Sequence, residues 1–215
     1  MFISSEMEII KPSENVEVIF AIKGLAYEGA SVKDELYSFL PQKILVGISP
    51  EEVAGLREFI DNPFTVPMGD YEVIYGTILS KFGEVEMPPP IFTQAVIYAN
   101  ARDVDIYGLD LDEKSFGDKY EENFRVWDMV RYIRRKRRMM RHTFDLSSPE
   151  TFIMQWKKLM EDNPSIRKME EVRQNAIKEN LSTFLKENGG ERILAVIEYE
   201  MKNHLENIVN SEVES

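Results

Sequence analysis

The chain of 215 residues is predicted to adopt an α/β fold with a mostly parallel central sheet flanked by helices. Between residues 16 and 112, short β-branched apolar segments alternate with longer amphipathic ones, which is the spacing of β-α-β units. A helical stretch at about 115–188 then precedes one more apolar segment at 192–199. We therefore expect a single domain over residues 1–215, with 115–188 as a helical insertion before the last strand.

The individual elements follow from local signals. Short apolar runs between turn residues predict buried strands, and these are 16–24, 43–48, 104–109 and 192–199. Apolar residues at helical spacing predict helices, and these are 32–40, 50–60, 68–83, 90–102, 118–142, 147–162, 165–187 and 200–209. Ser31, Ser49 and Ser148 are the expected N-caps of three of them, and Pro50 and Pro149 suit a first helical turn.

Composition limits the classes of function. The formal net charge is -12, and an acidic surface repels nucleic acid and anionic lipid. The chain has no cysteine, which excludes disulfides and zinc–thiolate sites. No apolar run approaches the roughly 18 residues that a membrane span needs, and the start MFISSEMEIIKP lacks the features of a signal peptide. A cytoplasmic protein is the default expectation.

One segment runs against this acidic background. RYIRRKRRMMRH (131–142) carries seven cationic side chains, namely Arg131, Arg134, Arg135, Lys136, Arg137, Arg138 and Arg141. It falls at the C-terminal end of a predicted helix, where the helix dipole favours cations. We expect these side chains to pair with acidic residues, within the chain or across a homodimer. The candidate partners are 118–122, Glu198, Glu200 and Glu206. Binding of nucleic acid or another anionic polymer is the alternative.

Carboxylates at strand ends are the candidates for chemistry. Asp110 and Asp112 follow the strand 104–109, and ligand sites of parallel α/β sheets lie at the carboxyl ends of strands. Two carboxylates on one turn can bind a hard cation, although Asp also commonly serves turns and helix caps. Phosphate-binding loops and nucleophile elbows are absent from the sequence. No catalytic residue is assigned beyond Asp110, Asp112 and Glu198 as candidates.

A second constellation combines Glu198, Glu200 and His204. Glu200 and His204 are four residues apart, so they share a face if the helix is continuous. Carboxylate and imidazole ligands suit Mn or Zn, but an ordinary surface pair explains the same spacing. We expect no cofactor, with a divalent metal as the alternative.

Several segments, in order, resemble the TraB/PrgY/GumN family, which includes Tiki-like proteins and shares a fold with ChaN and the erythromycin-esterase-like (EreA) proteins. The segments that carry the resemblance are GLAY (24–27), ILVGISPEEVAGL (44–56), DLD (110–112), RQNAIKENL (173–181) and AVIEYEM (195–201). They correspond to the family's GTAH-like motif, V-E-L element, D-R-D turn, E-R-N helix and second G-x-x-H motif.

The resemblance implies a ligand pocket and a loss of chemistry. The pocket positions are Gly24, Tyr27, Gly47, Asp110, Asp112, Asn175, Glu198 and Met201. In the family, two histidines and a glutamate are thought to form a metal-dependent hydrolytic site. Tyr27, Met201 and Gly47 stand at those positions here, and a phenol and a thioether are poor ligands for zinc or manganese.

The resemblance therefore implies a non-catalytic protein, a pseudoenzyme, that acts through protein–protein contacts or self-association as a homodimer. The alternative is a divergent metal-dependent hydrolase, peptidase-like or esterase-like, that uses Asp110, Asp112, Glu198, Glu200 and His204.

Overall fold

The structure, a computed structural model, describes residues 7–123, 135, 136 and 138–211. Its centre is a five-stranded sheet of order β1-β2-β5-β3-β4. The strands are β1 (Glu8–Ser13), β2 (Val16–Ala21), β3 (Lys43–Val46), β4 (Asp105–Gly108) and β5 (Ile193–Glu198). β1 pairs with β2 in the antiparallel sense, and the other neighbours are parallel. The predicted mostly parallel α/β sheet is confirmed.

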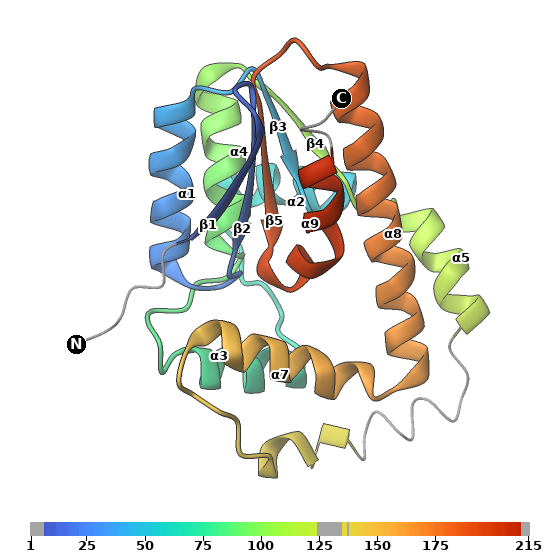
Figure 1. Cartoon of the computed structure of the whole chain (residues 1–215). Coiled ribbons are helices and arrows are strands. Elements are labelled where there is room, and N and C mark those ends of the chain that lie inside the picture. The colour runs from blue at the N-terminus through green and yellow to red at the C-terminus, as the bar shows by residue number, and fades with distance from the viewer. Residues whose placement is uncertain (1–6, 124–134, 137, 212–215) are drawn as a thin grey trace.

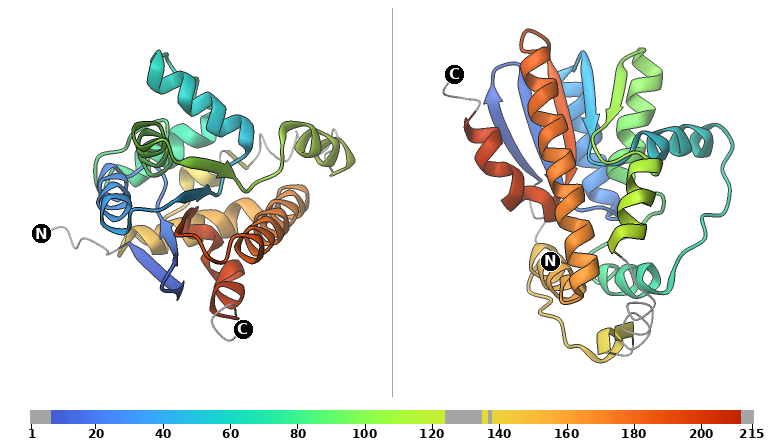
Figure 2. Two further views of the ribbon diagram at one scale, coloured as in Figure 1. Left: turned by 90° about the horizontal axis from the view of Figure 1, so that it is seen from above. Right: turned by 90° about the vertical axis from the view of Figure 1, so that its right-hand side faces the viewer.

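Helices cover both faces of this sheet (Figures 1 and 2). One face carries α1 (Ala26–Phe39), α2 (Pro50–Asp61) and α4 (Pro90–Arg102). The other carries α8 (Pro164–Glu187) and α9 (Lys202–Ser211), the latter after a 3₁₀ turn, η1 (Tyr199–Met201).

Two further helices, α3 (Asp70–Leu79) and α7 (Pro149–Glu161), lie below the sheet in Figure 1, at the end where β2 and β5 finish. We call these two helices the cap layer. α5 (Glu113–Asn123) packs against α8 at the side of the molecule. The predicted helical stretch before the last strand is therefore present as α5, α7 and α8.

The buried strands explain the layering. Every residue of β2 and of β5 is buried, as expected for central parallel strands covered on both faces. Because successive side chains of a strand point to opposite faces, Ile19 packs with α1 and α4 whereas Val18 and Phe20 pack with α8. A third apolar cluster, which includes Ile22, Leu25 and Phe152, fills the space under the cap layer.

Local capping signals were correct at two helices. Ser49 accepts a hydrogen bond from the Glu52 amide and completes a capping box at the start of α2. Ser148 accepts one from the Thr151 amide at the start of α7.

The predicted start of the first helix at Ser31 was wrong. α1 begins at Ala26, and the Ser31 hydroxyl donates to the Tyr27 carbonyl inside the helix. Glycine disfavours helix, so Gly29 argued against a helix that starts before Ser31. The structure requires glycine at this position because α4 crosses α1 there. A Cβ on Gly29 would lie 2.5 Å from Cβ of Pro90.

The edge strand β1 was not predicted. Pro12 lies within it and cannot donate to a ladder, which a sheet tolerates only at an edge.

The predicted helix 118–142 is described only in part. α5 starts earlier, at Glu113, and residues 138–141 are helical. Residues 124–134 and 137 lie outside the described residues. Among the described helices, none combines the length and the apolar character that crossing a membrane requires.

The close approach of α1 and α4 gives a direct test. Gly29→Ala is expected to lower the free energy of unfolding by about 1–3 kcal/mol, because the new methyl group overlaps Pro90. Gly55→Ala in α2 is the matched control, since nothing lies within 4 Å of a Cβ there, and it should stabilise by about 0.5–1 kcal/mol. Urea unfolding measures both; equal effects of the two variants would contradict the packing described.

Candidate functional site

Ionisable side chains gather where the parallel strands end. Lys23 follows β2, Asp110 follows β4, and Glu198 is the last residue of β5. Parallel strands bring their carboxyl ends to one edge of the sheet, which is where α/β proteins place their ligands. Helix α8 adds Arg173 to this edge. With Glu170 and Glu200, these residues form what we call the strand-end cluster.

Two ion pairs organise the cluster. The Lys23 ammonium donates to Oε1 of Glu198 at 2.8 Å, and the Glu198 side chain is 8% exposed. Nε and Nη2 of Arg173 both lie 2.6 Å from Oδ2 of Asp110. Nη1 of Arg173 also donates to Glu170 at 3.2 Å. Each central carboxylate therefore has a cationic partner.

Each ion pair shifts the pKa values of both of its members. Burial opposes ionisation of Glu198, but Lys23 and Arg173 outweigh it and lower the pKa of this carboxyl. Burial likewise opposes the charge on Lys23, yet Glu198 and Glu200 raise its pKa above the ordinary value. Burial raises the pKa of Asp110, and Arg173 opposes that rise. The side chains of Glu198 and Asp110 are 8% and 6% exposed, whereas those of Lys23 and Arg173 are 35% and 23% exposed. Removing a cation therefore leaves a buried carboxylate unpaired, which is the costlier loss.

Glu200 and Tyr75 differ from the paired groups. Burial raises the pKa of Glu200, Lys23 opposes the rise, and Glu198 adds to it. Burial also raises the pKa of Tyr75, from α3 in the cap layer, with Glu200 and Glu198 adding to it. Oε2 of Glu200 and the Tyr75 hydroxyl are buried without a hydrogen-bond partner among the described residues. Glu200 thus holds a proton more readily than Glu198 does.

Of the predicted pocket positions, only Asp110 and Glu198 belong to the cluster. Tyr27 lies in the first turn of α1 with its ring against Gly83, where a Cβ would be 3.3 Å away. Met201 is buried in the apolar core beneath α8 and α9. Gly24 lies in a turn and has a φ of +97°. Gly47 packs against Ile197.

Asp112 and Asn175 lie outside the cluster. Asp112 is exposed and accepts a hydrogen bond from the Ser115 amide at 2.7 Å, so it serves the start of α5. The hydrogen bonds from Ser115 also lower the pKa of Asp112. Asn175 is exposed on α8. The turn-capping interpretation therefore fits Asp112, whereas Asp110 is buried and paired.

The alternative metal site is not assembled. Among the described residues, no group of three or more His, Asp and Glu side chains is placed to hold a metal ion. Glu200 lies in the 3₁₀ turn Tyr199–Met201 and His204 lies in α9, so the two residues belong to different helical elements. Burial lowers the pKa of His204, and the charges that act on it come from Lys178 and Lys157.

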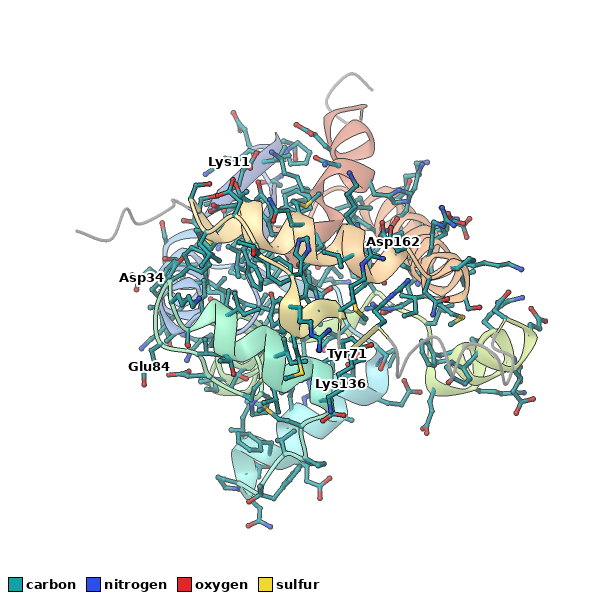
Figure 3. The ribbon with its side chains drawn as sticks, turned by 90° about the horizontal axis from the view of Figure 1, so that it is seen from below. Lys11, Asp34, Tyr71, Glu84, Lys136 and Asp162 are labelled. Carbon is teal, nitrogen blue, oxygen red and sulfur yellow. The ribbon has the colours of Figure 1, made fainter. Side chains whose placement is uncertain are left out.

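Three residues of the basic segment 131–142 contact the cap layer. Arg135 donates to the Met160 carbonyl at 2.7 Å, at the end of α7. Lys136, labelled in Figure 3, pairs with Asp70 at the start of α3, and Arg138 lies 3.5 Å from Asp162. Pairing with acidic residues within the chain was predicted, but Asp70 and Asp162 were not among the candidate partners. Arg141 is exposed, and Arg131, Arg134 and Arg137 lie outside the described residues.

Lys23, Arg173 and Glu170 of the cluster were not predicted from the sequence. Lys23 could have been found as the first charged residue after a buried strand. Arg173 lies inside a long helix among many charges, and no local signal distinguishes it. Tyr75 was equally hidden, because only the packing of the cap layer brings α3 to the strand ends.

Comparison of the chain with protein-family models and with curated proteins gives no match.

One more buried carboxylate lies near this edge. Glu28, in the first turn of α1, is 2% exposed, and its Oε2 has no hydrogen-bond partner among the described residues. Burial raises its pKa to about 7, the Ile22 amide opposes the rise, and Glu150 adds to it.

Glu28 should make stability depend on pH. Its folded pKa of about 7 lies above the ordinary value of 4.5, so its contribution is fully present below pH 4.5 and is lost as pH rises through 7. Glu28→Gln should remove up to about 3 kcal/mol of the loss in unfolding free energy between pH 5 and pH 8. The exposed Glu51→Gln is the control, and an unchanged pH dependence in Glu28→Gln would contradict this assignment.

Proposed function

We propose that this chain acts through contacts with other protein chains, including a second copy of itself, and that its strand-end cluster is structural. The cluster joins β2 to β5 through Lys23 and Glu198, and it joins the end of β4 to α8 through Asp110 and Arg173. On this proposal the chain binds its partners through its outer surfaces and not at the strand-end edge of its sheet.

The pairing of the strand-end carboxylates carries this proposal. A hydrolytic metal site needs several deprotonated donors that converge on one open position. Here Lys23 engages Glu198 and Arg173 engages Asp110, so the two best candidates are already neutralised.

The resemblance to the TraB/PrgY/GumN family fits the same proposal. We propose that the chain is a divergent member in which Tyr27 and Met201 stand at the positions of the family's histidines. Both side chains now contribute apolar packing, Tyr27 beneath the cap layer and Met201 under α8 and α9.

Divalent cations provide the first test. A ligand that binds only the folded state raises the melting temperature, so millimolar Mn²⁺, Zn²⁺ or Mg²⁺ should leave it unchanged. The same samples should show no peptide or ester hydrolysis above a no-protein blank. Metal-dependent hydrolysis that disappears in the double variant Asp110→Asn, Arg173→Met, shown to be folded by circular dichroism, would overturn the proposal. The double variant is used because the single change leaves Arg173 unpaired.

A second candidate function rests on Glu198 and Glu200. Glu198 is paired with Lys23, whereas Oε2 of Glu200 is buried without a hydrogen-bond partner among the described residues. The pKa of Glu198 is accordingly lowered and that of Glu200 raised, and two carboxyls in such different environments are what general acid–base catalysis uses. This candidate is a metal-independent hydrolase in which Glu200 donates a proton and Glu198 accepts one.

Glu200→Gln separates the two candidates. If the cluster is structural, this variant keeps the fold and becomes more stable at pH 8 than the parent, because a group that resists ionisation has been removed. If the cluster is catalytic, the parent hydrolyses a peptide or ester substrate with a bell-shaped pH profile and Glu200→Gln abolishes that activity. Thermal unfolding and the pH–rate profile together decide.

A further inference from the structure

An apolar groove lies on the cap layer, away from the strand-end cluster. It runs between α3 and residues 139–146 and has a volume of about 570 Å³. Its apolar walls include Val73, Ile74, Ile78, Met139, Met140 and Phe144. Val73 is 46% exposed and Met140 is 66% exposed, so the groove presents apolar side chains to the surface. Figure 3 shows the segment that carries Lys136 lying beside α3, which carries Tyr71.

The rim of this groove is basic. Lys81 and His142 line it, and the exposed Arg141 adjoins it. The chain as a whole has a net charge of -12, whereas Lys81 in the lining of the groove and the adjoining Arg141 are both cationic. An apolar groove with a cationic rim fits an amphipathic helix that carries aromatic anchors and carboxylates.

Helix α5 has this composition. None of its residues is buried, and Phe116 and Tyr120 stack along one row with ring centroids 6.3 Å apart. Glu113, Gly117 and Glu121 form the neighbouring row, since residues four apart share a helix face. In its own chain α5 packs against α8, and none of its residues lines the groove. An exposed aromatic pair beside carboxylates therefore complements the groove of another copy.

We infer that α5 of one copy docks into the groove of a second copy, with Phe116 and Tyr120 over the apolar floor and Glu113 and Glu121 facing Lys81 and Arg141. The inference rests on the proposed function, because it names the surface through which the chain associates. Reciprocal docking gives a two-fold dimer, and one-way docking gives an open chain of subunits.

The absence of cysteine allows a site-directed test. Thr77→Cys places a thiol in the groove, and Gly117→Cys places one beside the aromatic pair, where a Cβ meets nothing within 4 Å. Gly190→Cys is the matched control, since it is also unobstructed. Gly190 lies in the connection between α8 and β5, which Figure 1 shows at the end of the sheet opposite the cap layer. A disulfide forms only when the two Cα atoms come within roughly 7 Å.

The two cysteine variants of each pair are prepared with tags of different size, mixed, oxidised mildly and separated by gel electrophoresis. The Thr77→Cys and Gly117→Cys pair should give at least tenfold more mixed disulfide than the Thr77→Cys and Gly190→Cys pair. Equal yields would overturn the docking geometry. Sedimentation of the parent chain, with or without 1 M salt, should show a complex that salt weakens, since its contacts include exposed charges.

Reversing the charges on each side tests whether the acidic residues of α5 face the cationic residues of the groove. The variant Lys81→Glu, Arg141→Glu and the variant Glu113→Lys, Glu121→Lys should each associate roughly tenfold more weakly than the parent. A mixture of the two variants should recover association, because the reversed charges again face each other. A dimer that neither variant weakens would reject this surface while leaving self-association intact. A chain that stays monomeric at all concentrations would also reject it, for example because residues of the same chain cover the groove. Neither result bears on hydrolysis, which the metal experiment tests separately.

Discussion

The ion pair between Arg173 and Asp110 is the contact on which the arrangement of the helical stretch depends. The two residues are 63 positions apart, and their contact fixes α8 to the end of β4. The Lys23 and Glu198 pair makes a similar link between β2 and β5. Because buried charges are stable only with their partners, the sheet edge and α8 form one electrostatic unit.

This ion pairing determines which parts of the molecule are available for binding. Charges that hold the fold together are not free to bind a metal, and the cap layer covers the same edge with apolar side chains. The groove on the outside of the cap layer is different, since Val73 and Met140 in its apolar walls are exposed and Lys81 lines it. The basic segment contributes to this layer through Lys136 and Arg138, which pair within the chain, and through Arg141, which is exposed.

The sequence predicted elements whose causes are local. The buried strands follow from continuous β-branched runs, and Ser49 and Ser148 start their helices through contacts three residues away. The start of α1 could not be predicted, because Gly29 is explained only by Pro90 on another helix. Within the candidate site, Asp110 and Glu198 were found from their positions after strands. Arg173 and Tyr75 come from helices that only tertiary packing brings to the strand ends.

A double-mutant cycle on Asp110 and Arg173 tests the central claim most directly. The free energy of unfolding is measured for the parent, for Asp110→Asn, for Arg173→Met and for the double variant. If the pair holds α8 to the sheet, each single change is costly and the double variant loses much less than their sum, with a coupling energy of about 2 kcal/mol. Additive losses, with a coupling energy near zero, would contradict this account of the strand-end cluster.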